Sequence, residues 1–528
     1  MNEELKYLLG LTAKRKFSRR AFLGRAATMG LSAAVANTML AGAVRAEGPK
    51  KGGVLRLGLG GGAGTDTLDP ALAAGHVPFH LTRQFGETLV NVTPSGEIEY
   101  RLAESIDSSS DASTWYFRIR KGVEFHHGKT LTAEDALKTL QRHSDKSSQS
   151  QAVGLMMDIV SMRADGDVVE IALSAPNADF AYLMAERMLV IQAGGGFGNP
   201  ADGNGTGPYK VVEAAPGVRY LTEKFANYWD EGSGHFDQVE TLVINDATAR
   251  NSALQSGQVH MINGVDPKLV EFLGRSPGVQ IKNVSGRGHY VFPMFCNTAP
   301  FDNNDLRMAL KYAINRQEMV DKILRGFGSI GNDIPINASY PLFDHTIEQR
   351  EYDPERAAFH YKASGHDGSL IVLHTSGVAF PGAVEASQLF QQSAVAAGIP
   401  LEIKREPGDG YWSDVWNVKP FVASFWAGRP VQDQMYSTAY LSNAPYNDTR
   451  FHNETFDSLI VQAKGEIDPA KRKSLYGEAA RILRDEGGLI CPMFNDFIDA
   501  HSDKVAGWQD NPNNEMMNGF AATKCWFA

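Results

Sequence analysis

Hydrophobic and polar positions follow the period of a strand in some segments and that of a helix in others. Trp115, Phe117 and Ile119 occupy every second position, which predicts a strand with one buried face. A helix is expected to begin at Thr132, because Asp135 follows at the spacing of a capping box. The first half of the chain therefore mixes strands with helices and shows no repeat typical of a solenoid.

Two further segments of this half contain residues that typically form turns or end helices. Residues 205–229 read as two strands around a Pro-Gly turn. The helical segment that follows them is expected to stop near Gly257. Both features support a mixed α and β lobe.

The middle of the chain is dominated by helical spacing. Residues 301–328 place apolar side chains three and four apart, and Asn315 with Glu318 is spaced as a cap that restarts the helix. Gly326 is the expected stop. This segment predicts two consecutive helices.

Apolar runs and a helix alternate further on. Residues 369–375 predict a buried strand, the helix after it ends at Gly398, and a second strand follows, so that the three form a βαβ unit. A short amphipathic stretch and a strand over residues 420–426 predict a second unit. In open α/β sheets ligands lie beyond the carboxyl ends of the strands, and His374 and Arg429 stand at such ends. Arg429 is therefore predicted to face a cleft, with a structural pairing to Asp433 as the equal alternative, because a buried arginine requires a partner.

The first 46 residues have the features of an export signal. Arg19 and Arg20 lie within SRRAFLG, which resembles the twin-arginine signature. A charge-free run and the small residues before Ala46 follow, which favours cleavage after Ala46, with Ala43 as a second site. The run is too weakly apolar for a good membrane anchor. We expect a soluble periplasmic protein.

Charge and length narrow the classes of function. A chain of 528 residues exceeds the size at which one core stops growing, so more than one domain is expected. The formal net charge of the whole chain is -10, and the first 46 residues carry eight Lys or Arg and two Glu, which leaves -16 for the rest. An acidic surface without a basic stripe argues against a nucleic-acid partner. The three cysteines have no metal-ligand spacing, and one bond between Cys491 and Cys525 is the only disulfide we consider.

Motifs for catalysis or cofactors are weak. Ser276 sits in a nucleophile-elbow pattern, but Pro277 follows it and cannot donate an N–H to an oxyanion, so a serine hydrolase is a remote alternative. A nickel or metal-chelate binder through His374 or His345 remains an alternative. Residues 58–63 fit a dinucleotide fingerprint without the helix that it needs. We expect no enzyme activity, no cofactor and no metal site.

Five motifs in the same order resemble one family. They are WYFRIRKGVEFHHG with TAEDA (115–136), GTGPY (205–209), RMALKYAINR (307–316), YDPERA (352–357) and LYGEAARIL (475–483). Together they resemble the family 5 solute-binding proteins of ABC transporters, the periplasmic dipeptide, oligopeptide and nickel binders. The resemblance covers nearly all of residues 50–520.

The resemblance implies an α/β, two-lobe periplasmic binding protein fold of type II, large cluster, with an extra subdomain and mixed sheets flanked by helices. Residues 47–290 would form the first lobe with the extra subdomain, 291–493 the second lobe of βαβ units, and 494–528 the return to the first lobe. The chain would cross between lobes near Tyr290–Asn297 and Leu489–Asn495. The implied protein is a monomer that encloses a small-molecule or peptide-like solute and delivers it to an ABC permease in the inner membrane.

One position departs from the family's pattern. Peptide-binding members usually place an aspartate shortly after the tryptophan that corresponds to Trp426, and Arg429 stands there instead. A guanidinium suits a carboxylate, so we predict that Arg429 binds an anionic group while Trp426 and Trp412 pack the ligand. Asp433 would orient the guanidinium or receive an amine. His374 and Thr67 complete the expected set.

The export signal is tested by replacing Arg19 and Arg20 with Lys. We expect precursor to accumulate in the cytoplasm, because a twin-arginine signal depends on this pair. Fractionation and immunoblotting of the two compartments measure it. Efficient export of the variant would contradict the twin-arginine interpretation.

Overall fold

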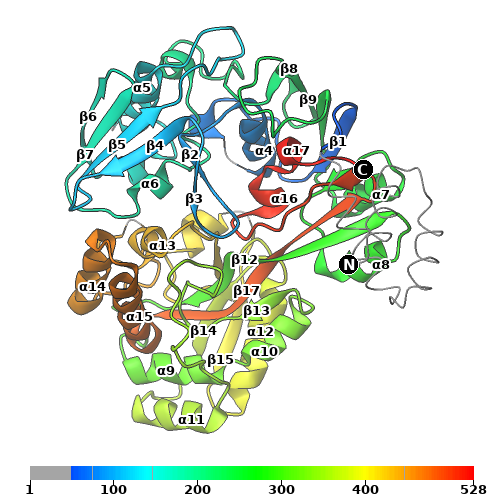
Figure 1. Cartoon of the computed structure of the whole chain (residues 1–528). Coiled ribbons are helices and arrows are strands. Elements are labelled where there is room, and N and C mark those ends of the chain that lie inside the picture. Colours follow the sequence, from blue (N-terminus) through cyan, green and yellow to red (C-terminus); the bar gives the residue numbers. More distant parts are fainter. Residues whose placement is uncertain (1–48, 74, 146, 409, 445) are drawn as a thin grey trace, which may run out of the picture.

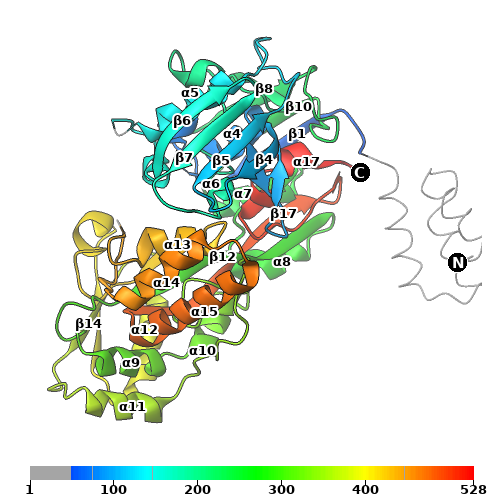
Figure 2. The ribbon, with the colours of Figure 1, turned by 60° about the vertical axis from the view of Figure 1, so that its left-hand side comes forward.

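The computed structural model describes residues 49–73, 75–145, 147–408, 410–444 and 446–528. The expected signal over residues 1–46 lies outside this part of the chain. The described residues form two lobes, one above the other in Figure 1 and, from another side, in Figure 2. This arrangement confirms the two-lobe α/β fold.

One nine-stranded sheet runs through the molecule in the order β16-β12-β17-β11-β1-β10-β9-β8, with β13 attached to β17. Its two long strands, β12 (Val279–Pro293) and β17 (Leu489–Ser502), pair antiparallel and pass from one lobe to the other. Parts of the chain that are about 200 residues apart in sequence thus form one connection. The other members are β1 (Val54–Leu59), β8 (Tyr209–Ala215), β9 (Arg219–Lys224), β10 (Gln238–Val243), β11 (Met261–Ile262), β13 (Gly328–Ile330) and β16 (Ser424–Trp426).

A second sheet stands at the outer side of the upper lobe. It has the order β4 (Ala103–Ser108), β5 (Thr114–Ile119), β7 (Val168–Leu173) and β6 (Ile159–Asp165), all antiparallel. Trp115, Phe117 and Ile119 on β5 are buried, as their alternation predicts. Helix α5 (Ala133–Ser144) packs against this sheet, and the capping box of Thr132 and Asp135 is present.

The remaining elements of the upper lobe are short. A Pro-Gly turn joins β8 to β9, and Gly217 there has a φ of 74°, which only glycine adopts freely. Both agree with the sequence prediction, as does the end of α7 near Gly257. The helices and strands are α4 (His76–Phe85), α6 (Phe180–Leu183), α7 (Ala247–Gln255), α8 (Val270–Gly274), α16 (Glu515–Asn518), α17 (Ala521–Lys524), β2 (Val90–Val92), β3 (Ile98–Tyr100), β18 (Val505–Ala506) and β19 (Trp526–Phe527).

Helices make up most of the lower lobe. The predicted restart is confirmed, since Asn315 caps the second of two consecutive helices and its Oδ1 accepts the N–H of Glu318 at 3.1 Å. Strands β14 (Ile371–Thr375) and β15 (Leu401–Arg405) pair in parallel on either side of a helix, which confirms the first βαβ unit. The helices are α9 (Asn304–Ala313), α10 (Arg316–Lys322), α11 (Pro354–Ala363), α12 (Ala383–Val395), α13 (Gln432–Ala439), α14 (Glu454–Gly465) and α15 (Pro469–Glu486).

The second predicted βαβ unit is wrong. Residues 411–415 form a single helical turn, and β16 pairs antiparallel with β12, Trp426 opposite His289. One isolated parallel bridge, between His374 and Val422, is the link to β14. The long interlobe strand β12 offers a continuous edge, which takes up this short strand in place of the small parallel sheet. Arg429 thus follows a strand of the interlobe sheet.

Two further sequence expectations concern bonds and membranes. Cys296, Cys491 and Cys525 are free, so the bond considered between Cys491 and Cys525 is not formed. Cys491 belongs to the core of the lower lobe and Cys525 to that of the upper lobe. None of the described helices is both long and apolar enough to cross a bilayer.

A buried ion network holds the lower lobe together. Asp333 is fully buried and accepts hydrogen bonds from Arg316 at 2.6 Å and Arg350 at 2.6 Å, and from the backbone N–H of Cys491 at 3.1 Å. Burial raises the pKa of Asp333, but the two guanidiniums outweigh it, so the pKa lies below its usual range. The stabilisation is therefore present above the unfolded pKa of about 3.9 and is lost as the pH falls through the folded pKa.

Replacing Asp333 with Ala should lower the free energy of unfolding by about 3–5 kcal/mol at pH 7, because two buried guanidiniums lose their counter-ion. Urea unfolding followed by circular dichroism measures it. The matched control is Asp165→Ala, since Asp165 is largely exposed and lies 3.6 Å from Arg163; it should cost less than about 1 kcal/mol. Equal losses in the two variants would contradict the role of the network.

Candidate functional site

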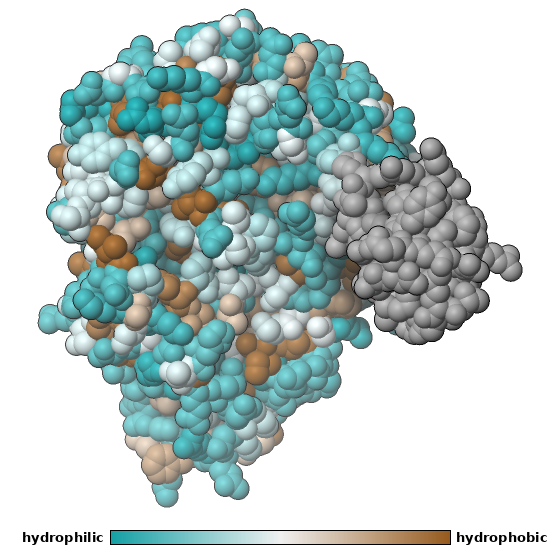
Figure 3. All heavy atoms as spheres, viewed as in Figure 1, coloured by the Kyte–Doolittle hydropathy of each residue, from teal (hydrophilic) through white to brown (hydrophobic). Residues whose placement is uncertain are grey.

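A large cavity lies between the two lobes. Its volume is about 2020 Å³, above the range of about 300–1,000 Å³ that is common for small-molecule sites. The upper lobe contributes some of residues 75–92, 150–158, 175–188 and 513–518, the lower lobe some of residues 378–381, 412–444 and 446–465, and the interlobe strands Gly288, Tyr290, Asn495 and Phe497. The face of the molecule drawn in Figure 3 is mostly hydrophilic with separate apolar patches. The cavity is therefore wide enough for a solute larger than a single amino acid.

An aromatic wall forms its lower side. Trp416 is the centre, with its ring 6.0 Å from Trp412, 6.3 Å from Trp426 and 6.3 Å from Tyr446. Phe425 lies 5.7 Å from Trp412. Such rings offer a large apolar surface with flat faces, suited to the apolar or ring portion of a solute.

A buried carboxylate sets the orientation of this wall. Oδ2 of Asp448 accepts the indole N–H of Trp416 at 3.1 Å and that of Trp426 at 3.3 Å. Burial raises the pKa of Asp448 to about 7, although the two indole hydrogen bonds oppose the shift. Asp448 is 1% exposed, so it acts on a ligand only through the indoles.

Arg429 lies on the loop between β16 and α13, and a different arginine fixes that loop. Arg287 of β12 is 2% exposed and donates to the carbonyl of Pro430 at 3.0 Å and to that of Ser339 at 2.7 Å. Gly428 packs so close to Arg287 that a Cβ would lie 2.1 Å from the Cβ of Arg287. Arg287 is thus the structural arginine of the region.

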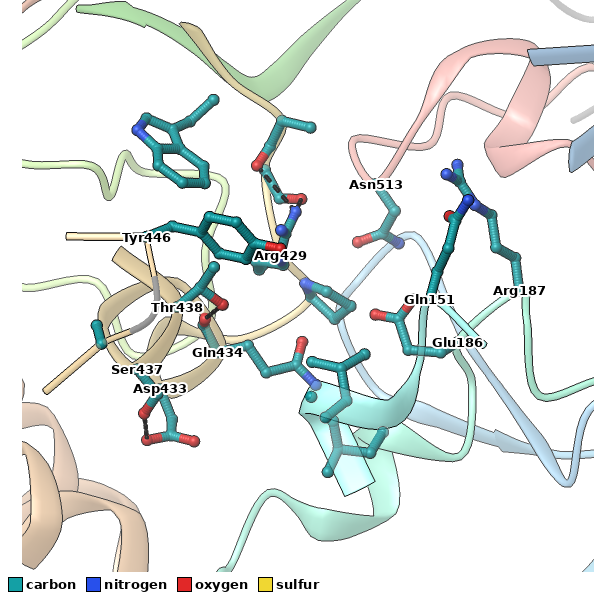
Figure 4. A pocket seen from close by; sticks show the side chains of 18 of the residues that line it. Gln151, Glu186, Arg187, Arg429, Asp433, Gln434, Ser437, Thr438, Tyr446 and Asn513 are labelled. Atoms are coloured by element: carbon teal, nitrogen blue, oxygen red, sulfur yellow. Dashed lines mark hydrogen bonds between the residues drawn. The ribbon is translucent and has the colours of Figure 1, made fainter. Parts of the chain in front are cut away.

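The side chain of Arg429 is half-buried and lines the cavity (Figure 4). Its Nη1 donates to the carbonyls of Ala427 at 3.3 Å and Gly428 at 3.4 Å, which are long bonds to its own loop. Within the part of the chain that the structure describes, it forms no ion pair within 4.0 Å. A guanidinium has five donors, so most of those of Arg429 are left for a ligand.

Asp433 does not pair with Arg429. Its Oδ1 accepts from the hydroxyl of Ser437 at 3.0 Å, one turn along α13. Burial raises the pKa of Asp433 to about 6, opposed by nearby Lys464 and reinforced by Asp179. The predicted alternative, an ion pair between Arg429 and Asp433, is therefore not formed. Asp433 lines the cavity as a separate acidic group.

Gln434 is the next residue of α13 and was missed by the sequence reasoning. It is 5% exposed and lines the cavity, yet neither its Nε2 nor its Oε1 has a hydrogen-bond partner among the described residues. A buried primary amide without a partner is costly, so a ligand or water is expected to satisfy it. No sequence pattern marks this residue apart from its place five residues after Arg429.

Two residues of the expected set are placed elsewhere. His374 is not among the cavity-lining residues, and its Nδ1 lies 2.7 Å from the carboxylate of Glu406. Thr67 is also not among them, and its hydroxyl accepts the N–H of Asp69 at 3.1 Å. The geometry therefore brings together Arg429, Trp426, Trp412 and Asp433 and leaves these two outside.

The geometry gives little support to the two alternative functions, a serine hydrolase and a metal-binding protein. Ser276 accepts a hydrogen bond from Gln255 at 2.7 Å, and its hydroxyl contacts no His, Asp or Glu in the described part of the chain. His345, named with His374 as a metal ligand, packs its ring against Phe343 at 4.9 Å. In residues 49–528, apart from the four left out, no group of three or more His, Cys, Asp or Glu could hold a metal ion.

Comparisons with known proteins agree with this architecture. A model of the bacterial extracellular solute-binding proteins, family 5 Middle, matches residues 97–448. The glutathione-binding protein GsiB of Escherichia coli (strain K12) is 24% identical over 470 residues, which are 86% of this chain and 91% of GsiB.

Solved structures share the fold at low sequence identity. DppA from Helicobacter pylori in complex with the peptide STSA has a TM-score of 0.76 and 22% identity, covering 90% of this chain and 98% of DppA. AgaA in complex with agropinic acid, from A. tumefaciens R10, has a TM-score of 0.76 and 22% identity, covering 90% and 99%. Since the family model spans two thirds of the chain, this protein belongs to the bacterial extracellular solute-binding proteins of family 5.

Proposed function

We propose that this protein is the periplasmic solute-binding component of an ABC importer and that its solute is peptide-like and bears a carboxylate. The observation that carries the proposal is Arg429, a half-buried guanidinium on the cavity wall that forms no ion pair in the described chain. Relatives support the class of solute, because glutathione, the peptide STSA and agropinic acid are the ligands named for them.

We assign one part of the solute to each group of residues that lines the cavity. Arg429 receives the carboxylate through charge-assisted hydrogen bonds. Trp412, Trp416 and Trp426 pack the apolar or ring portion. Asp433 receives an amine where the solute has one, since that pairing would favour its charged form.

Transport requires export and a membrane partner. The signal features of residues 1–46 support secretion through the twin-arginine route, which carries folded proteins, and the protein then acts as a soluble monomer. Closure of the two lobes around the solute is a shift between open and closed populations, and the permease recognises the closed form. Turnover of the solute is not part of this role.

Arg429→Ala should weaken binding of a carboxylate-bearing solute at least about tenfold. The affinity of Arg429→Lys should lie between those of the wild type and the Ala variant, because a charge remains but the planar fork is lost. Calorimetry with glutathione, the peptide STSA and agropinic acid measures it, with native mass spectrometry of protein from its host to identify bound solute. Arg163→Ala is the control, an exposed arginine on the outer sheet. Wild-type affinity of both variants, or a bound solute without an anionic group, would overturn the proposal.

Asp448→Leu should release both indoles of the aromatic wall, whereas Asp448→Asn keeps an acceptor oxygen. We expect a red-shifted tryptophan emission for the Leu variant and a loss of about 1–3 kcal/mol of unfolding free energy, from two hydrogen bonds of about 0.5–1.5 kcal/mol each. Fluorescence and urea unfolding measure the two effects. An Asn variant as disturbed as the Leu variant would show that the indole bonds are not what matters.

A further inference from the structure

Arg187 is a second arginine of the cavity without a partner. It lies on the loop after α6, in the upper lobe, and lines the cavity. Its guanidinium carbon is 5.2 Å from the ring centre of Phe79, a cation–π contact. Among the described residues it forms no hydrogen bond and no ion pair. All five of its N–H donors are therefore open to a ligand or to water.

The other cations of the cavity contact groups of the protein itself. Lys464 pairs with Asp158 at 2.7 Å, and His76 with Glu515 at 2.7 Å. Arg83 is buried and donates to the carbonyl of Ala185 at 3.2 Å. Among the described residues, the cavity-lining arginines without an ion pair are Arg83 and Arg187 in the upper lobe and Arg429 in the lower lobe. Arg83 is only 6% exposed, so the accessible ones are Arg187 and Arg429, one from each lobe.

The two arginines lie on opposite sides of the cavity. Figure 4 shows Arg429 with Gln434 on one side, and Arg187 with Glu186 on the other. Burial lowers the pKa of Arg187, Glu186 opposes this, and the charge of Arg429 lowers it further, so the two guanidiniums are within electrostatic reach of each other. Glu186 offsets one of the two positive charges at most.

We infer that Arg187 is a second anion-binding residue and that the acidic group of the solute is held between Arg187 of the upper lobe and Arg429 of the lower lobe. The inference rests on the proposed function and adds the residue through which the anion joins the lobes. A carboxylate has two oxygens and about four acceptor sites, enough for two guanidiniums. The anion replaces a repulsion between the lobes by two attractions, and so shifts the population towards the closed form.

The repulsion can be measured without a ligand. Small-angle X-ray scattering is recorded on protein stripped of solute by unfolding and refolding, at 0.01 M and 1 M NaCl, where the screening length is about 30 Å and about 3 Å. At low salt, Arg187→Gln and Arg429→Gln should each be more compact than the wild type, and high salt should compact the wild type alone. Arg163→Gln, which removes an exposed arginine that is not among the cavity-lining residues, should match the wild type. A scattering profile of Arg187→Gln that equals the wild type at both salt concentrations would overturn the inference.

The shared anion is tested by a double-mutant cycle with glutathione as the probe. Each single Gln variant should weaken binding at least about tenfold, and the double variant should lose at least about fivefold less than the product of the single losses, because the two residues hold one group. Loss of binding with Arg429→Gln alone would retain the proposed function and reject Arg187. Wild-type affinity of both single variants would reject both the proposed role of Arg429 and that of Arg187. If glutathione is not bound by the wild type, the scattering result decides.

Discussion

The pairing of β12 with β17 is the constraint on which the rest of the structure depends. These strands are joined from Val279 opposite Ser502 to Pro293 opposite Leu489, and they pass through both lobes. Their register shifts between Ser285 and His289, next to the cavity. Any change in this ladder would move one lobe against the other, so the ladder decides which side chains face each other across the cavity.

Arg287 converts that backbone pairing into a fixed site. It extends from β12, where the register shifts, and its Nη1 reaches Pro430 of the lower lobe and Asn513 of the upper lobe, at 3.0 and 2.6 Å. Its guanidinium also stacks over Tyr340 at 4.8 Å. One buried arginine, fully engaged, thus holds the loop on which another arginine is left unpaired. This division of roles explains why two arginines so near each other have opposite surroundings.

The local sequence pattern was enough to predict most helices and strands, but it did not predict which distant strands pair with each other. The capping box at Thr132, the restart at Asn315 and the first βαβ unit all depend on neighbours in sequence, and all were predictable. The strand before Arg429 was misassigned, because its partner β12 lies about 135 residues away and no local spacing encodes that choice.

The residues of the site were likewise predictable only where a local pattern marks them. Trp426 and Arg429 stood out beside a strand, whereas Arg187 and Gln434 have no pattern and become notable only through missing partners. His374 was chosen for its place at the carboxyl end of a strand, and β14 does pair in parallel with β15, but its imidazole contacts Glu406 and does not line the cavity. Thr67 is not among the lining residues either.

Arginines without an ion pair in the cavity are compatible with the acidic net charge of the chain, because salt screens distant charges. Residues 47–528 carry a formal charge of -16, yet charges more than about 8 Å away are largely screened at physiological ionic strength. A solute in the cavity therefore responds to the groups around it. Of these, Asp433 has a pKa raised by burial to about 6, and Asp158 and Asp179 are paired with Lys464 and Arg472. Arg187 and Arg429 form no ion pair among the described residues, so they favour an anion at this place even though the net charge of the chain does not. Selection of the solute is then a matter of the cavity wall, and the net charge of the chain bears on its solubility.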